Sequence, residues 1–283
     1  MGVGNVIAYD FEYDGERLSD KGFQLCTFDG GGLNTISNGS VITFNQISTL
    51  GGQKYLLTSS AYEECLTTTI QICKRICDQD VELKITQAEM RHIMQWLNRK
   101  EFHELVFLGD PLLDGVRFYA SFNVNKVEYG GELFGLELEV LTDRPFGLGE
   151  EINQTIRLRT PYEDPKADNT GRSLSFDIES TSDEEGFIYP DSVLIVPYEK
   201  GDFSLVNTLE DHEVSIKGVQ IGEKIQMDYP IILTNRSDHK VQNDFNWNYF
   251  RIANTYRNHT NHYTSSLPCN ITITYSPIIK IGF

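Results

Sequence analysis

Short segments of alternating apolar and polar residues, each bounded by Gly, Asn, Asp or Pro, recur along almost the whole chain of 283 residues. A period of two residues is typical of half-buried β-strands, and these segments are rich in β-branched and aromatic residues. The chain therefore predicts a mainly β protein. The segments with this pattern are 6–13, 23–28, 40–44, 66–73, 116–129, 133–141, 155–159, 173–178, 192–197, 204–207, 213–217, 224–227 and 270–275.

One segment has the helical period instead. Thr86 and Glu89 have the spacing of a capping box, in which the Thr hydroxyl accepts from the Glu amide and the Glu side chain reaches back. Apolar residues then follow at i, i+3, i+4 and i+7, which gives one buried stripe. We expect a helix over about 87–99 that packs on a sheet, with this stripe formed by Met90, Ile93, Met94 and Leu97.

Glycine pairs and turn residues predict how the strands are grouped. Gly130–Gly131 joins two long strands, which should be antiparallel. Gly51–Gly52 separates two strand-like runs, so a protruding two-stranded arm is expected within about 45–73. The turn-rich segment 142–147 marks a domain boundary, which gives an N-terminal domain of 1–148 and a C-terminal domain of 149–283. The second domain has about seven short strands, a number that indicates a β-sandwich or jelly roll.

Charge and cysteine content exclude several classes of protein. The formal net charge of −17 argues against a duplex DNA-binding protein, which needs clustered cations. Segment 163–191 contains nine acidic and two basic residues and should be solvated. No apolar stretch is long enough to insert in a membrane. The cysteines follow no disulfide or zinc pattern and are expected to be reduced; they are Cys26, Cys65, Cys73, Cys77 and Cys269.

No catalytic motif is present. The chain lacks a nucleophile elbow, a zinc protease motif and a phosphate-binding loop, and its carboxylates fall mainly in turns. His259 and His262, with Cys269 after them, are the best metal-like group, but exposed loop histidines are the expected interpretation. We predict no catalytic, metal-binding or cofactor-binding residue. The residues alone indicate a binding or assembly protein and not an enzyme.

Several segments, in this order along the chain, resemble the distal tail proteins of long-tailed phages. In the first half they are 9–20 (YDFEYDGERLSD), the following 22–30, the run from Gly51 to Cys73, and the helix with Trp96–Leu97. In the second half they are 201–202, 222–225, 243–247 and 269–277. The acidic segment 161–186 departs from the family pattern.

The resemblance implies an architecture and a role. The N-terminal domain would combine a β-sandwich or barrel, one helix and a belt hairpin, and the C-terminal domain would be galectin-like. Six copies would form a ring at the tail tip (baseplate) of the virion, made in the bacterial host cytoplasm. The ring would join the tail tube protein to the tail-tip hub or tail-associated lysin and support receptor-binding proteins during host attachment. DNA would pass through the lumen without specific binding, since six copies at −17 each carry about −102.

Two groups of residues are candidate interaction sites on this basis. The arm would pack on a neighbouring subunit through Tyr55, Leu56, Leu57 and Tyr62. The alternative for the tyrosines is a core or half-exposed strand position. A candidate glycan platform consists of Phe245, Trp247 and Tyr249, for which core packing is the favoured interpretation.

Two other functions remain open from the sequence. The first is a carbohydrate-binding module that recognises host-surface glycans. The second is a glycan-degrading enzyme, which would need two carboxylates about 5 to 9 Å apart in a cleft. Within the favoured interpretation, contractile and non-contractile tails are equally compatible with the sequence.

Overall fold

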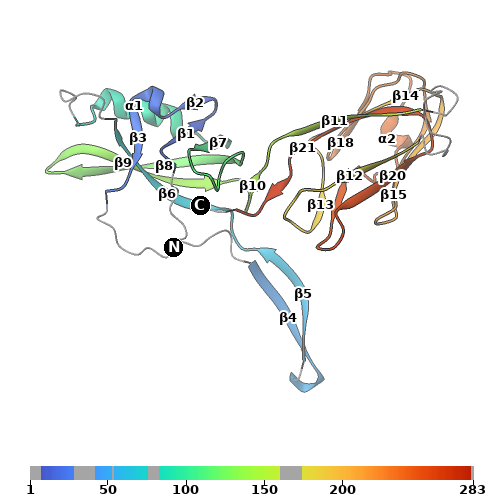
Figure 1. Ribbon diagram of the computed structural model, residues 1–283, viewed down its shortest axis with the longest axis horizontal. Coiled ribbons are helices and arrows are strands. Elements are labelled where there is room, and N and C mark those ends of the chain that lie inside the picture. The colour runs from blue at the N-terminus through green and yellow to red at the C-terminus, as the bar shows by residue number, and fades with distance from the viewer. Residues whose placement is uncertain (1–7, 29–41, 53, 76–82, 160–173, 282–283) are drawn as a thin grey trace. The chain divides into compact units, whose positions relative to one another are not determined.

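The computed structural model describes residues 8–28, 42–52, 54–75, 83–159 and 174–281. Antiparallel strands dominate, and the chain divides into two compact units (Figure 1). The first unit contains the residues up to Gly149 and also the C-terminal residues from Ile279. The second unit contains residues 150–278. The mainly β fold class predicted from the sequence is confirmed. None of the helices in the described ranges has the length and apolar character required to span a membrane.

The first unit is built on a large antiparallel sheet with strand order β2-β1-β7-β8-β9-β6-β3, and β10 and β22 pair off this path. Two short 3-10 turns, Ser19–Lys21 and Leu50–Gly52, also belong to the unit. Its strands are β1 (Asp10–Tyr13), β2 (Glu16–Arg17), β3 (Phe23–Cys26), β4 (Ile42–Thr49), β5 (Lys54–Tyr62), β6 (Thr67–Lys74), β7 (His103–Leu108), β8 (Arg117–Tyr129), β9 (Glu132–Thr142), β10 (Gly147–Leu148) and β22 (Ile278–Ile279), the last of which begins at the final residue of the second unit.

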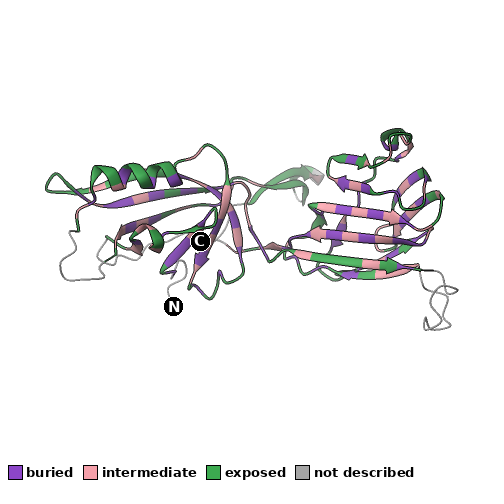
Figure 2. Cartoon of the chain, turned by 90° about the horizontal axis from the view of Figure 1, so that it is seen from above, coloured by how far each residue is buried: buried purple, intermediate pink, exposed green. Residues whose placement is uncertain are grey.

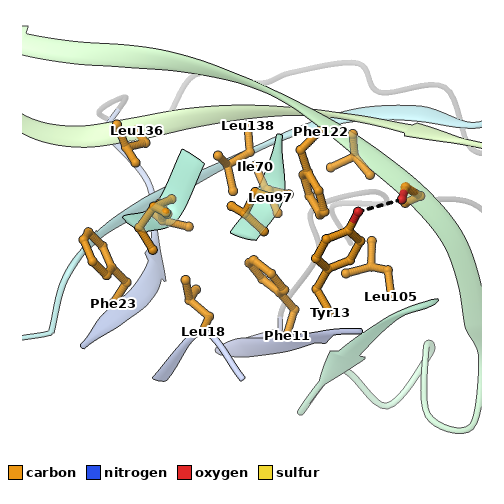
Figure 3. Packing of buried hydrophobic residues seen from close by; sticks show 14 of the residues in the cluster. Phe11, Tyr13, Leu18, Phe23, Ile70, Leu97, Leu105, Phe122, Leu136 and Leu138 are labelled. Carbon is orange, nitrogen blue, oxygen red and sulfur yellow. Dashed lines mark hydrogen bonds between the residues drawn. The ribbon is translucent and has the colours of Figure 1, made fainter. Parts of the chain in front are cut away.

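Large side chains from both ends of the sheet order meet in one core (Figure 3). Phe11 and Tyr13 of β1 are fully buried and contact Phe122 of β8, with ring centroids 5.9 and 4.9 Å away. The Tyr13 hydroxyl donates to the carbonyl of Ala120 at 3.2 Å, a bond drawn in Figure 3. Phe23 of β3, at the other end of the sheet order, belongs to the same buried cluster.

Helix α1 (Gln87–Leu97) closes the core through Met90, Ile93, Trp96 and Leu97. Met94 of the predicted stripe is exposed, and Trp96 is buried in its place. Both hydrogen bonds of the Thr86–Glu89 capping box are present. The Glu89 amide donates to the Thr86 hydroxyl at 3.3 Å, and the Thr86 amide donates to the Glu89 carboxylate at 2.7 Å. The helix ends at Leu97, two residues before the predicted end. Arg99 instead places its guanidinium over the Tyr13 ring and 2.8 Å from a carboxylate oxygen of Asp14.

The second unit is a β-sandwich. A five-stranded sheet has the order β11-β21-β14-β17-β18, a four-stranded sheet has the order β12-β20-β15-β16, and β13 pairs with β19. Its elements are β11 (Ile152–Leu158), β12 (Ser175–Glu179), β13 (Gly186–Ile188), β14 (Ser192–Pro197), β15 (Gly201–Asn207), β16 (His212–Val219), β17 (Ile225–Asp228), β18 (Ile231–Thr234), α2 (Val241–Asp244), β19 (Ile252–Asn254), β20 (Thr260–Ser265) and β21 (Cys269–Tyr275).

Alternate residues of both sheets point into a single core. Ile195 of β14 and Ile271 of β21 belong to the larger sheet, and Leu205 of β15 and Ile216 of β16 belong to the smaller one. All four are buried in the same cluster. The resulting alternation of buried and less buried positions is visible along the strands in Figure 2. The two sheets therefore pack face to face, as the strand count predicts.

Three sequence predictions differ from the structure in their limits. The arm is the hairpin 42–62, whereas β6, included in the predicted 45–73, belongs to the main sheet. The predicted second domain reaches residue 283, but Ile279 and Ile281 pack against the first core. These two residues are partly buried there, and no sequence period could indicate which core they join. Much of the acidic segment lies in 160–173, outside the described residues.

Candidate functional site: the arm and an aromatic surface

The arm, residues 42–62, is a separate two-stranded sheet. Strands β4 and β5 pair only with each other among the described strands (Figure 1). Gly51 and Gly52 have φ of 62° and 88°, so the tip uses the left-handed backbone that glycine adopts readily. Lys54 carries the arm's single charge. A two-stranded hairpin is marginal in water unless it packs against something else.

A β-bulge sorts the side chains of the arm into two unlike faces. The register shifts between Asn45 and Gln46, where Thr58 is the extra residue and its hydroxyl donates to the Asn45 carbonyl at 2.9 Å. Because one extra residue reverses the alternation of β5, Tyr55 and Leu57 come to the same face as Phe44. We name this the apolar face of the arm; it carries Ile42, Phe44, Tyr55, Leu57 and Tyr62.

Most of the apolar face is exposed. Phe44, Tyr55 and Leu57 expose 58%, 63% and 56% of their surface. Tyr62, at the root, is half-buried and meets the Phe146 ring edge-on, with centroids 6.3 Å apart. Of the four predicted contact residues, the bulge therefore places Tyr55, Leu57 and Tyr62 on the apolar face and Leu56 on the opposite face, where it pairs with Ile47.

The candidate glycan residues do not share one strand. Phe245 and Tyr249 are buried with ring centroids 5.1 Å apart, as the core interpretation predicts, whereas Trp247 exposes 58% of its surface. Segment 246–249 lies outside the strands and α2, so the expected period of two is not a strand period here. Trp247 has a φ of 64°, a backbone conformation rarely adopted by residues other than Gly.

Two asparagines hold Trp247 in this conformation. The Asn246 side chain accepts from the Ser215 amide at 3.2 Å and donates to the Glu213 carbonyl at 2.8 Å. The Asn248 side chain donates to the same carbonyl at 3.0 Å. Strand β16 thus fixes both neighbours of the indole, which points outward on a tied loop.

Further aromatic rings continue from this loop. Tyr249 meets Tyr229 edge-on at 5.2 Å, and Tyr229 stacks on Tyr189 at 4.6 Å. Tyr189 and Tyr229 are both exposed. Sequence reasoning missed these two tyrosines because they lie in separate turns, and only the folded chain brings them together. We name Tyr189, Tyr229 and Trp247 the aromatic surface.

The metal-like histidines face different partners. His259 Nδ1 lies 2.6 Å from the Asn254 side-chain oxygen, and His262 Nδ1 lies 2.5 Å from an Asp177 carboxylate oxygen. Cys269 is buried, and burial raises the pKa of its thiol to about 11. Across the described ranges, no group of three or more His, Cys, Asp or Glu residues has the arrangement of a metal site.

One buried polar cluster has no signal in the sequence. Glu223 accepts from the Thr234 hydroxyl at 2.5 Å and from the Gln220 amide at 2.9 Å, and it lies 2.6 Å from His239 Nδ1. Burial alone raises the pKa of Glu223, but these hydrogen bonds outweigh burial and hold it below its ordinary value. The cluster ties the turn before β17 to the segment after β18.

Comparison with known families identifies both halves of the chain. Residues 6–144 match the model of a phage tail protein N-terminal domain, and residues 163–275 match that of a phage tail C-terminal domain. The chain belongs to a family of phage tail proteins. The resemblance seen in the sequence is thereby confirmed. Comparison with curated protein sequences gives no significant match.

The fold of this tail protein is also known from a solved structure. It is similar to the SPP1 Dit (gp 19.1) protein, which is described as a paradigm of the hub adsorption apparatus in phages that infect Gram-positive bacteria. The TM-score is 0.59 at 12% identity, and the match covers 95% of this chain and 98% of the other. The shared fold extends over both units, as the resemblance implies.

Proposed function

We propose that this tail protein forms a hexameric ring at the distal end of the phage tail tube. The ring joins the tube to the tail-tip hub or tail-associated lysin and supports receptor-binding proteins during attachment and DNA ejection. Its place is the virion tail tip, and its role is structural and not catalytic. Membership of the tail family and the Dit fold support this role.

The single observation that carries the proposal is the exposed apolar face of the arm. A β-rich hairpin that has a single charge and exposes Phe44, Tyr55 and Leu57 to water is an aggregation hazard unless another surface covers it. Each such side chain contributes roughly 1 to 2 kcal/mol when it moves from this exposure into an interface. In a ring each copy gives one arm and receives one, so every apolar face is covered without leaving an open end.

The first experiment measures the mass of the purified protein by light scattering after size exclusion. The proposal expects a species near six times the 32.2 kDa of one chain. The bulge supplies a matched pair of variants. Phe44→Ser with Leu57→Ser removes the apolar face and should abolish the ring, whereas Ile47→Ser with Leu56→Ser on the opposite face should leave it intact.

If the purified protein is a monomer, the same variants are tested in assembling particles, where the tail supplies the neighbouring surfaces. Deletion of residues 47–61 should then stop tail assembly. Normal particles from that deletion would refute a role for the arm. Equal loss in both double variants would refute the assignment of the apolar face.

A second candidate function is recognition of host-surface glycans by the aromatic surface. The observation that favours it is the exposed Trp247, held outward on a fixed loop. Ring contacts through Phe245 and Tyr249 connect it to the exposed Tyr229 and Tyr189. Indole and phenol rings are suited to stack on the apolar faces of sugars. Trp247→Ala should abolish binding to purified host cell-wall polysaccharide, whereas Tyr256→Ala, at another exposed tyrosine, should not. Equal binding by both variants would reject this function.

A further inference from the structure

Cys26 and Cys73 are diagonal neighbours on one face of the first sheet. Strands β3 and β6 are antiparallel, with Cys26 opposite Gln71 and Gln24 opposite Cys73. Partners in such a register point to the same side, so both thiols project from the same face. Each cysteine is half-buried and free, and reagents can therefore reach both.

The two thiols also interact. Burial raises the pKa of the Cys26 thiol, and the adjacent Cys73 thiol raises it further through a hydrogen bond and through charge repulsion. The side-chain amide nitrogen of Gln24 lies 3.9 Å from the Cys73 sulfur, the distance of a weak donor contact.

The two cysteines flank the arm in the sequence, and Cys73 lies near the end of β6 that is farther from the arm. The 46 residues between the two cysteines contain the whole arm. The chain leaves β3 to reach the arm, and it returns from β5 directly into β6. A covalent link from β3 to β6 would close a loop of the chain that contains the arm, and it would hold β3, the last strand in the sheet order, on its neighbour.

We propose that Cys26 and Cys73 form a disulfide that fixes the edge strand β3 to β6 when the protein passes from a reducing to an oxidising medium. A tail protein makes this passage when virions leave the host cell. That biological setting rests on the proposed function, whereas formation of the bond does not.

The chemistry needs an external disulfide of low molecular weight as the oxidant. The Cys73 thiolate attacks one sulfur of that disulfide and releases the other half as a thiolate. Cys73 then carries no charge, which removes the charge repulsion that raises the pKa of Cys26. The Cys26 thiolate attacks the Cys73 sulfur and releases the second half. The two protein thiols are oxidised, and one external disulfide is reduced to two thiols.

Strand geometry makes this bond reversible. Diagonal Cα atoms of an antiparallel pair lie about 7 to 8 Å apart, beyond the usual range for a disulfide, so the bond requires a shift of β3 toward β6. Strand β3 has four residues and a single neighbour among the described strands, so such a shift breaks no strand pairing on its other edge. A bond that requires such movement is more easily reduced than a buried structural disulfide.

The test oxidises the full-length protein with oxidised glutathione at pH 8, alkylates it under denaturing conditions and maps linked peptides by mass spectrometry. The expected result is the loss of two of the five thiols, a Cys26–Cys73 linked peptide, and a thermal midpoint for the first unit raised by roughly 5 to 10 °C. Dithiothreitol should reverse all three changes.

Single serine variants provide the controls. Cys26→Ser and Cys73→Ser should each abolish the bond and the thermal shift, whereas Cys65→Ser should retain both. Five alkylated thiols after oxidation would overturn the proposal, and so would a link through Cys65, Cys77 or Cys269. These thiol measurements do not depend on the ring, so failure of either proposal is recognised separately.

Discussion

Replacing Glu223 with Gln should weaken the second unit, because this carboxylate is 1% exposed and has three partners. Gln has nearly the same shape, but one of its two terminal atoms is an NH₂ group. That group must face the Thr234 hydroxyl, the Gln220 amide or the ring nitrogen of His239, each of which needs an acceptor in the present arrangement. At least one buried donor therefore loses its bond.

The expected loss follows from that count. A buried donor left without an acceptor costs about 1 to 3 kcal/mol, and hydrogen bonds to a charged group are at the upper end. Glu223→Gln should thus lower the free energy of unfolding by about 2 to 3 kcal/mol. For a unit of this size, such a change lowers the urea midpoint by roughly 1 to 2 M.

Urea unfolding followed by tryptophan fluorescence measures this change in one unit. Trp96 lies in the first unit and Trp247 in the second, so a Trp96→Phe background leaves a reporter only in the second unit. The matched control is Glu213→Gln, the same chemical change on the exposed surface of β16, which should shift the midpoint by less than about 0.3 M. Equal shifts in the two variants would refute the role assigned to Glu223.

The pH dependence tests the same argument through its sign. The folded pKa of Glu223 lies below its ordinary value of 4.5, so the unfolded chain takes up the proton at a higher pH than the folded chain. The stabilisation is therefore complete above about pH 4.5 and is lost as the pH falls through the folded pKa. The difference between the parent and Glu223→Gln should narrow below pH 4, and a constant difference down to pH 3 would contradict this account.

Three further substitutions test other parts of the structure. Thr86→Ala removes the hydroxyl that caps α1 and should lower the stability of the first unit by about 1 kcal/mol in thermal unfolding, whereas Thr86→Ser should retain most of it. Gly135→Ala places a methyl group 1.9 Å from the Phe28 ring and should cost about 1 to 3 kcal/mol in the same assay; an unchanged midpoint would show that the ring moves aside freely. Asn246→Ala should release the Trp247 loop, seen as faster quenching of the second unit's fluorescence by acrylamide, and equal quenching would mean that Asn248 holds the loop alone.

Local sequence signals predicted the parts of the fold that local chemistry decides. The capping box involves only the four residues from Thr86 to Glu89, and the Gly130–Gly131 turn joins strands that are adjacent in the chain. Both are present as predicted. The end of α1 was predicted two residues late. The backbone leaves the helical conformation at Asn98, and Arg99 then contacts Asp14 and Tyr13, about 85 residues away in the chain. No pattern near Arg99 could reveal those partners.

The candidate sites show the same division. Gly51–Gly52 indicated the arm, but the faces of the arm depend on a single bulge at Asn45 that no alternation pattern in either strand reveals. The aromatic surface combines Tyr189, Tyr229 and Trp247 from three separate turns, so it has no sequence period at all. The Glu223 cluster likewise depends on Thr234 and His239, which approach only after β17 and β18 have paired.

The bulge in the arm is the strongest physical argument for a one-sided partner. If Thr58 paired with Gln46 in a regular register, strict alternation would divide the large apolar side chains evenly. One face would carry Ile42, Phe44, Leu56 and Tyr62, and the other would carry Ile47, Tyr55 and Leu57. A hairpin of that kind suits insertion between two partners. With the bulge, Ile42, Phe44, Tyr55, Leu57 and Tyr62 share one face, and Ile47 and Leu56 are the large apolar residues left on the other. An arm with one apolar and one polar face can lie against one neighbour while its polar face stays in water. Such a contact joins two different surfaces, as a head-to-tail ring requires.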